Sequence, residues 1–145
     1  MTAKEFLMRA RSVDRRVDEA IERVDRLRAK LEAGRMSSVT GMPRGGSGDW
    51  TQTADRLIEL EQRVNAQIRE LVRLKHAAMD AIDWVEDARQ REVLELYYID
   101  GYKWDQVAER MGLDERQVFR LHGRALQRIE VPEEVPEEVA NYGKT

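Results

Sequence analysis

The chain has 145 residues, of which 37% are charged and 41% hydrophobic, and it contains no cysteine. This length is enough for one ordinary domain or for a small domain with an extended helical element. The lack of cysteine excludes disulfides and thiolate–metal sites, and no apolar run is long enough to cross a bilayer or to form a signal-peptide core. The net charge of −3 averages over unlike segments, so it does not exclude nucleic acid as a partner. We expect a largely helical, soluble, cytoplasmic protein without a metal or cofactor.

The first predicted element is a long helix over residues 4–33, whose apolar residues recur at alternating steps of four and three. This is the heptad spacing of a coiled-coil seam. The seam consists of Phe6, Ala10, Val13, Val17, Ala20, Val24, Leu27 and Leu31. Because alanine and valine make it thin, the helix needs a partner to be stable.

Residues 34–49 contain five glycines, three serines and a proline, so we predict a loop over residues 34–50 in which the chain reverses. A second long helix is predicted from Thr51 or Thr53 to Val85. Its seam is Leu57, Leu60, Val64, Leu71, Leu74, Ala78 and Val85, with the polar Gln67 at a position that sets register. The two helices pair either within one chain, as a helical hairpin over residues 1–86, or across two chains as a homodimer.

Residues 87–129 predict three short helices, each with its own start and stop signals. Asp87 or the Glu86-Asp87 pair opens the first helix, and Asp100-Gly101 closes it. The second helix covers Trp104 to Met111, and Gly112 supplies a left-handed turn. Asp114 caps the third helix with Gln117 three residues later, which is the capping-box pattern. The arrangement is that of a helix–turn–helix, whose last helix enters the major groove of DNA.

The third helix carries an arginine every four residues, at 116, 120, 124 and 128, while Val118, Leu121, Ala125, Leu126 and Ile129 face the core. Arginine pairs with guanine and glutamine with adenine, so Arg116, Gln117 and Arg120 are candidates for base edges. Phe119 suits a thymine methyl, and Lys103 and Arg124 suit phosphates. The predicted DNA-binding set is Lys103, Glu115, Arg116, Gln117, Phe119, Arg120, Gly123 and Arg124.

Other readings of these residues stay open. Residues 89–129 contain eight Lys or Arg against seven Asp or Glu, so the module is barely basic and the arginines are also explicable as a solvated surface. We expect Trp104 and the tyrosines at 97, 98 and 102 to be packing groups. His122 is placed on the helix flank, either near a phosphate or as an incidental surface residue.

Residues 91–129 resemble region four of bacterial sigma factors. The likeness lies in Glu92-Val93-Leu94-Glu95-Leu96-Tyr97-Tyr98, in the turn after Val107-Ala108, and in Arg124-Ala125-Leu126. Tyr98-Ile99-Asp100-Gly101, Trp104 and the Arg120–Leu126 string are similar to the RinA and ArpU groups of phage late-gene activators. The chain departs from the sigma pattern at Glu115-Arg116-Gln117 and at Phe119, where a basic residue is common, so promoter specificity does not carry over.

Residues 130–145 contain two copies of Val-Pro-Glu-Glu and are predicted to be an acidic disordered tail. Such a tail serves either as a solubilising segment or as an autoinhibitory strip over the arginines.

Enzymatic activity finds no support, because the two histidines are far apart and Gly45-Gly46-Ser47-Gly48 lacks the lysine of a phosphate-binding loop. The resemblance implies a phage-encoded transcription regulator in a bacterial cell, with double-stranded DNA and RNA polymerase as partners, no membrane contact, and dimerisation through the coiled coil. Two alternatives are a small-terminase-like packaging adaptor and a polymerase-docking protein without DNA readout.

Overall fold

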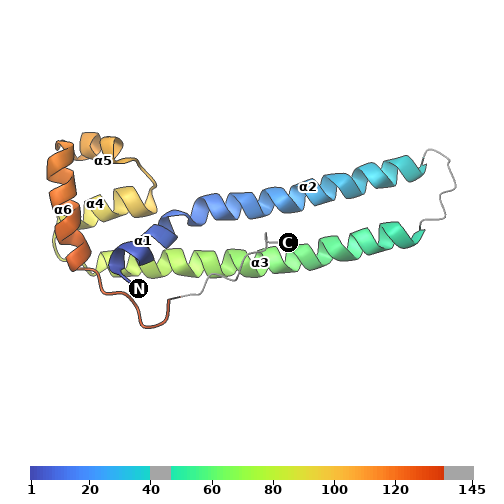
Figure 1. Cartoon of the computed structure of the whole chain (residues 1–145), viewed down its shortest axis with the longest axis horizontal. Helices are drawn as coiled ribbons and strands as arrows, with labels where there is room; N and C mark the ends of the chain where they lie inside the picture. The colour runs from blue at the N-terminus through green and yellow to red at the C-terminus, as the bar shows by residue number, and fades with distance from the viewer. Residues whose placement is uncertain (40–46, 136–145) are drawn as a thin grey trace. The chain divides into compact units, whose positions relative to one another are not determined.

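The computed structural model describes residues 1–39 and 47–135, and Figure 1 shows that they form helices joined by short turns. No strand occurs in these two ranges, which confirms the all-α prediction. None of the described helices is long and apolar enough to span a membrane. The elements are α1 (Ala3–Arg11), α2 (Val13–Val39), α3 (Ser47–Asp83), α4 (Ala88–Leu94), the π-helix η1 (Glu95–Ile99), α5 (Trp104–Met111) and α6 (Glu115–Gln127).

The chain divides into two compact units. One is a hairpin unit, Arg15–Arg69, and the other joins Met1–Asp14 to the residues from Glu70 onwards. We call the second the C-terminal unit, although it includes α1. The N-terminal residues therefore group with the helix–turn–helix, whereas the sequence had placed all of residues 1–86 in one helical hairpin.

The predicted helix over residues 4–33 is broken at Ser12, whose hydroxyl donates a hydrogen bond to the carbonyl oxygen of Arg9 at 2.9 Å. The first helix, α1, starts with a capping box in which Thr2 and Glu5 each accept from the other's backbone N–H at 3.1 Å. Its apolar residues Phe6 and Leu7 are completely buried. α1 packs against η1 and α6, so Phe6 does not belong to the hairpin seam, and Leu7 is buried although the heptad spacing did not include it.

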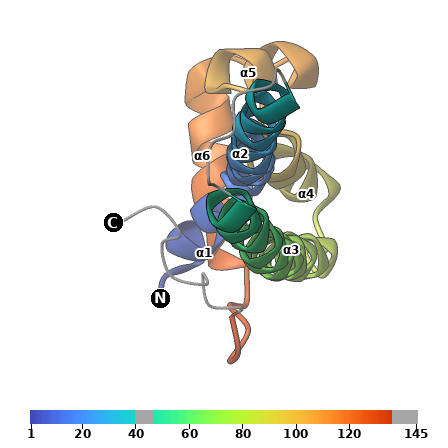
Figure 2. The same cartoon turned by 90° about the vertical axis from the view of Figure 1, so that its right-hand side faces the viewer.

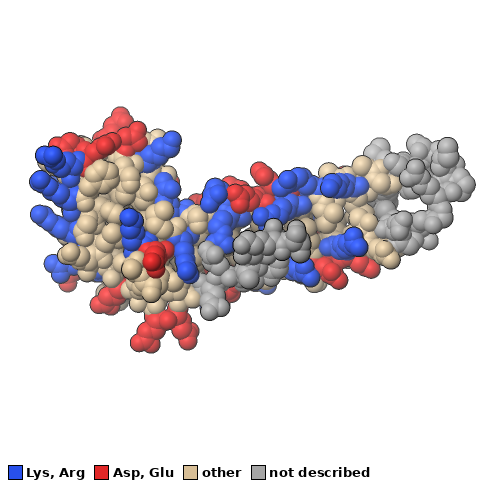
Figure 3. Space-filling model, in the orientation of Figure 1, with Lys and Arg blue, Asp and Glu red and all other residues tan. Residues whose placement is uncertain are grey.

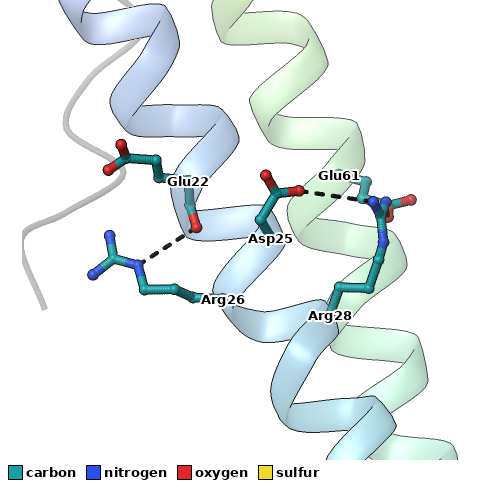
Figure 4. A network of polar contacts seen from close by, with 5 residues as sticks. All are labelled: Glu22, Asp25, Arg26, Arg28 and Glu61. Atoms are coloured by element: carbon teal, nitrogen blue, oxygen red, sulfur yellow. Dashed lines mark hydrogen bonds and ion pairs between the residues drawn. The ribbon is translucent and has the colours of Figure 1, made fainter.

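In the hairpin unit, α2 and α3 run side by side and antiparallel (Figure 1). Ala20 and Val24 of α2 and Leu57 and Val64 of α3 form the buried centre. The half-buried side chains packed against them are Leu27, Leu31, Leu60 and Ile68. At the edge of this core, Arg28 of α2 pairs with Glu61 of α3 (Figure 4). The hairpin thus closes within one chain, the first of the two pairings that the sequence left open.

The two hairpin helices are longer than predicted. α2 continues to Val39 and α3 begins at Ser47, whereas we had predicted a loop over residues 34–50. A single glycine inside a helix costs about 1 kcal/mol relative to alanine, so Gly34 alone does not end a helix. Residues 40–46 of the predicted loop and residues 136–145 of the predicted tail lie outside the described residues. Gln67 is buried on the seam as predicted, and its side-chain oxygen has no hydrogen-bond partner in the described part.

The helices of the helix–turn–helix begin and end close to the predicted residues. Asp87 caps α4 by accepting from the backbone N–H of Gln90 at 2.9 Å. Gly112 ends α5 with a left-handed backbone, at φ 66° and ψ 32°. The backbone N–H of Leu113 then donates to Ala108, which closes the turn at 3.0 Å. Helix α6 packs against α1, α4 and α5. Figure 2 shows α5 across one end of α6 and α1 beside the other end.

The π-helix η1 was not predicted. Its wider turn is closed by a hydrogen bond from the backbone N–H of Asp100 to the carbonyl oxygen of Glu95 at 2.9 Å, five residues earlier. Such turns often occur at functional positions. Here the turn contains Tyr97 and Tyr98, which contact α1 and α6 residues described below.

Candidate nucleic-acid interface

The start of α6 is held by a reciprocal pair of hydrogen bonds. The Asp114 carboxylate accepts from the backbone N–H of Gln117 at 2.8 Å, and the Gln117 side-chain oxygen accepts from the backbone N–H of Asp114 at 3.1 Å. Two otherwise unpaired N–H groups are satisfied in this way. The bidentate adenine contact predicted for Gln117 needs the same side-chain oxygen, so it competes with the cap.

Helix α6 has one buried face and one exposed face. Val118 and Ala125 are completely buried, and Ile129 just beyond the helix is also buried, as predicted. The eight residues of the predicted DNA-binding set are all exposed. Seven of them lie on α6, and Lys103 lies at the N-terminal end of α5. The set therefore occupies the outer side of the helix–turn–helix.

The arginines of α6 are free of protein carboxylates within the described part of the chain. Arg116, Arg120, Arg124 and Arg128 are all exposed, and no ion pair forms between them and the described acidic side chains. Figure 3 shows Lys and Arg side chains gathered along the outer side of α6. An unpaired guanidinium keeps its full set of donors for a phosphate or a guanine edge. This face is suited to DNA even though the module as a whole is barely basic.

A shallow hollow of about 240 Å³ lies beside α6. It is lined by Arg89, Leu113, Gln117, Arg120, Leu121 and Arg124. Arg89, an exposed residue in the first turn of α4, was not among the predicted DNA-binding residues. One signal was available: a cation in the first turn of a helix opposes the helix dipole, at a cost of about 0.3–1 kcal/mol.

His122 lies in the core, so its predicted place on the helix flank was wrong. Its Nε2 is 2.7 Å from the hydroxyl oxygen of Tyr98, and the two residues are 9% and 1% exposed. Burial and, to a smaller extent, the charge of the nearby Lys4 in α1 together lower the pKa of His122 to about 4. Burial also raises the pKa of Tyr98. Near neutral pH both groups are therefore uncharged, and their hydrogen bond joins η1 to α6.

Aromatic rings surround this hydrogen bond. Trp104 stacks on Tyr97, with ring centroids 3.7 Å apart and planes 10° from parallel. The same indole meets His122 edge-on at 4.6 Å and Phe119 edge-on at 5.4 Å. The packing roles expected for Trp104, Tyr97 and Tyr98 agree with these contacts. The cluster fixes α6 against α5 and η1, and it reaches the surface at Phe119, which is 47% exposed.

These features give the C-terminal part of the chain the arrangement of a helix–turn–helix. Residues 87–129 match the family described as Sigma-70, region 4. Domains of this family bind DNA and RNA polymerase and are regulatory, not enzymatic. No curated protein and no solved structure matches the chain. The match begins at the cap of α4 and leaves α1, α2 and α3 outside it.

Proposed function

We propose that the protein is a phage-encoded transcription regulator that binds double-stranded DNA through α6 and activates late genes together with bacterial RNA polymerase. The observation that supports this proposal best is the row of exposed arginines at 116, 120 and 124 on α6 and at 128, its C-cap, without ion pairs to described carboxylates. Phosphate contacts by such residues release counterions and give salt-dependent affinity. Arg116, Arg120 and Phe119 read base edges, and Lys103, Arg89 and Arg124 position the protein on phosphates.

A selection from a random duplex pool, carried out over a salt series, tests the DNA-binding part. We expect an enriched motif whose affinity falls steeply with salt and is lost in Arg120→Glu. Arg63→Glu is the matched control, because Arg63 is an exposed hairpin arginine and the charge change is identical. Weak binding without an enriched motif, or an equal loss of affinity in both variants, would contradict sequence-specific recognition by α6.

The polymerase part is tested separately by transcription in vitro from a template that carries the selected motif. Activation that survives Arg120→Glu would assign the protein to the polymerase-docking alternative, because DNA readout by α6 would then be dispensable. Activation that disappears together with DNA binding supports the regulator.

Self-association through the hairpin unit belongs to the same proposal. Ile21 of α2 and Ile58 of α3 are 44% and 53% exposed, so each leaves apolar surface that a second copy of the chain would cover. A hollow of about 290 Å³ lies between the two helices and is lined by Ile21, Val24, Asp25, Arg28, Glu61, Val64, Asn65 and Ile68. Its apolar floor and its charges of both signs suit a second copy of the same surface, which would complete a four-helix bundle.

The particle mass in solution distinguishes the proposed dimer from the packaging adaptor. Sedimentation equilibrium of the full chain should give a dimer, which Ile21→Glu converts to a monomer. A ring of many subunits would favour the small-terminase-like alternative, in which the helix–turn–helix holds DNA without strong sequence preference.

A further inference from the structure

Phe119 is the apolar exception on the exposed face of α6. Its ring is 47% exposed, one residue before Arg120 and three after Arg116, so it shares a helix face with Arg116. Aromatic side chains bury large areas when they find a partner. In this chain the only ring contact of Phe119 among the described residues is the edge of Trp104, at 5.4 Å and 66°. About half of the Phe119 surface is thus left facing solvent.

Trp104 supports the Phe119 ring on the side that faces the protein. Trp104 is itself held by the Tyr97 ring, stacked at 3.7 Å, and by the buried His122, at 4.6 Å. A side chain already supported in one orientation loses less conformational freedom when it binds a ligand. The exposed part of the ring is therefore a rigid apolar surface on the arginine-bearing side of the helix.

Gly123 lies one turn after Phe119 and leaves the space beside it open. A Cβ built at this position would meet no atom within 4 Å, so packing within the protein does not require glycine there. Glycine inside a helix is less stable than alanine by about 0.5–1 kcal/mol. Residues at i and i+4 are neighbours on a helix surface, so the missing side chain gives a ligand closer access to the Phe119 ring and to the α6 backbone.

The major groove contains a single type of apolar group, the C5-methyl of thymine. We propose that Phe119 recognises a thymine through this methyl group, with Trp104 as the positioning residue for the ring and Gly123 as the gap that admits the base edge. This inference rests on the proposed DNA-binding function and adds one base preference to it. Covering one methyl group is expected to change affinity by about fourfold.

The test exchanges thymine for deoxyuridine, which removes only the methyl group. The full chain is titrated against its selected duplex and against duplexes with one thymine replaced at a time. For the wild-type protein we expect about fourfold weaker binding when one particular thymine per bound helix is replaced. For Phe119→Ala the same replacement should not change the affinity. Arg116→Ala is the matched control, because it lowers affinity for both duplexes and keeps the ratio between them.

The role of Trp104 is tested by the ratio of the affinities for the thymine and deoxyuridine duplexes. A general loss of protein stability lowers both affinities and leaves this ratio unchanged. Trp104→Leu should reduce the ratio towards one, and Trp104→Phe should restore most of it by keeping an aromatic edge against Phe119. A wild-type protein that binds its selected duplex equally well with every thymine replaced would overturn the inference while leaving DNA binding intact. Failure to select any duplex would instead overturn the proposed function and this inference together.

Discussion

Arg11 and Tyr97 are 86 residues apart in the chain and are joined by a hydrogen bond from the guanidinium Nε to the Tyr97 carbonyl oxygen at 3.0 Å. The same guanidinium lies 4.3 Å from the centre of the Tyr97 ring and donates to the carbonyl oxygens of Gly101 and Tyr102 at 3.4 Å. These carbonyls belong to the end of η1 and the turn that follows, where helix carbonyls lack partners. One side chain of α1 therefore holds the segment that leads into α5, although the family match begins only at residue 87.

Removing the Arg11 guanidinium should destabilise the C-terminal unit. We expect Arg11→Ala to lower the free energy of unfolding by about 1–3 kcal/mol, because carbonyl oxygens lose a charged donor. Thermal denaturation followed by circular dichroism measures this loss. Arg9→Ala, at an exposed position of the same helix, is the control. Equal melting temperatures for the two variants would contradict the role given to Arg11.

The buried His122 makes stability depend on pH. Its pKa in the folded protein is lowered to about 4, so below the ordinary value of about 6.5 the unfolded chain binds more protons. Stability is fully present above pH 6.5 and is lost as the pH falls towards 4. Between pH 8 and pH 5 the free energy of unfolding should fall by about 2 kcal/mol from this group.

Urea denaturation at the two pH values measures this effect. His122→Gln should remove most of the pH dependence, whereas His76→Gln should retain it because His76 is exposed. If both variants lose stability in the same way as the wild type, the pH dependence comes from other groups.

Gly123→Ala should separate stability from binding. The substitution fits without contacts and should stabilise α6 by about 0.5–1 kcal/mol, while DNA affinity falls because a methyl group enters the space beside Phe119. Gly34→Ala is a matched control, since Gly34 is also helical and unobstructed but lies in the hairpin unit. Fluorescence anisotropy with the selected duplex and thermal denaturation give the two quantities. Unchanged affinity in Gly123→Ala would show that DNA does not approach this turn.

Arg89 should act as a phosphate contact. It lines the same hollow as Arg120 and Arg124, so Arg89→Ala should weaken binding to all duplexes by a similar factor. The slope of the logarithm of affinity against the logarithm of salt concentration should fall by about 0.9, the value for one phosphate contact. Arg63→Ala should leave the slope unchanged. A change in sequence preference instead of slope would make Arg89 a base-reading residue.

The local chemistry of the helix–turn–helix was readable from the sequence. Asp87, Gly112 and the Asp114–Gln117 pair were assigned as caps and turns, and each occupies that role in the structure. These signals involve residues within a few positions of one another, so they act before any tertiary contact forms. The exposed position of the candidate DNA-binding residues follows from the same helical period.

The sequence was less informative about which residues pack against one another within the chain. The apolar period of residues 4–33 correctly marks faces that must be buried, but it assigned Phe6 and Ala10 to the hairpin seam instead of to the C-terminal unit. His122 was placed on the helix flank, but it is buried, and its burial depends on the hydroxyl of Tyr98, 24 residues earlier.

The sequence by itself determined that the protein is helical, where the helices of the C-terminal module begin and end, and which of its faces is charged, because periodicity and capping are properties of short segments. The tertiary structure alone decided that α1 packs against η1 and α6, that Arg11 holds the end of η1, that His122 is neutral and buried, and that Arg89 joins the arginines of α6. The sequence shows that an apolar helix face must be buried. The residues that bury it come from distant parts of the chain and are selected by shape and hydrogen-bonding geometry in three dimensions.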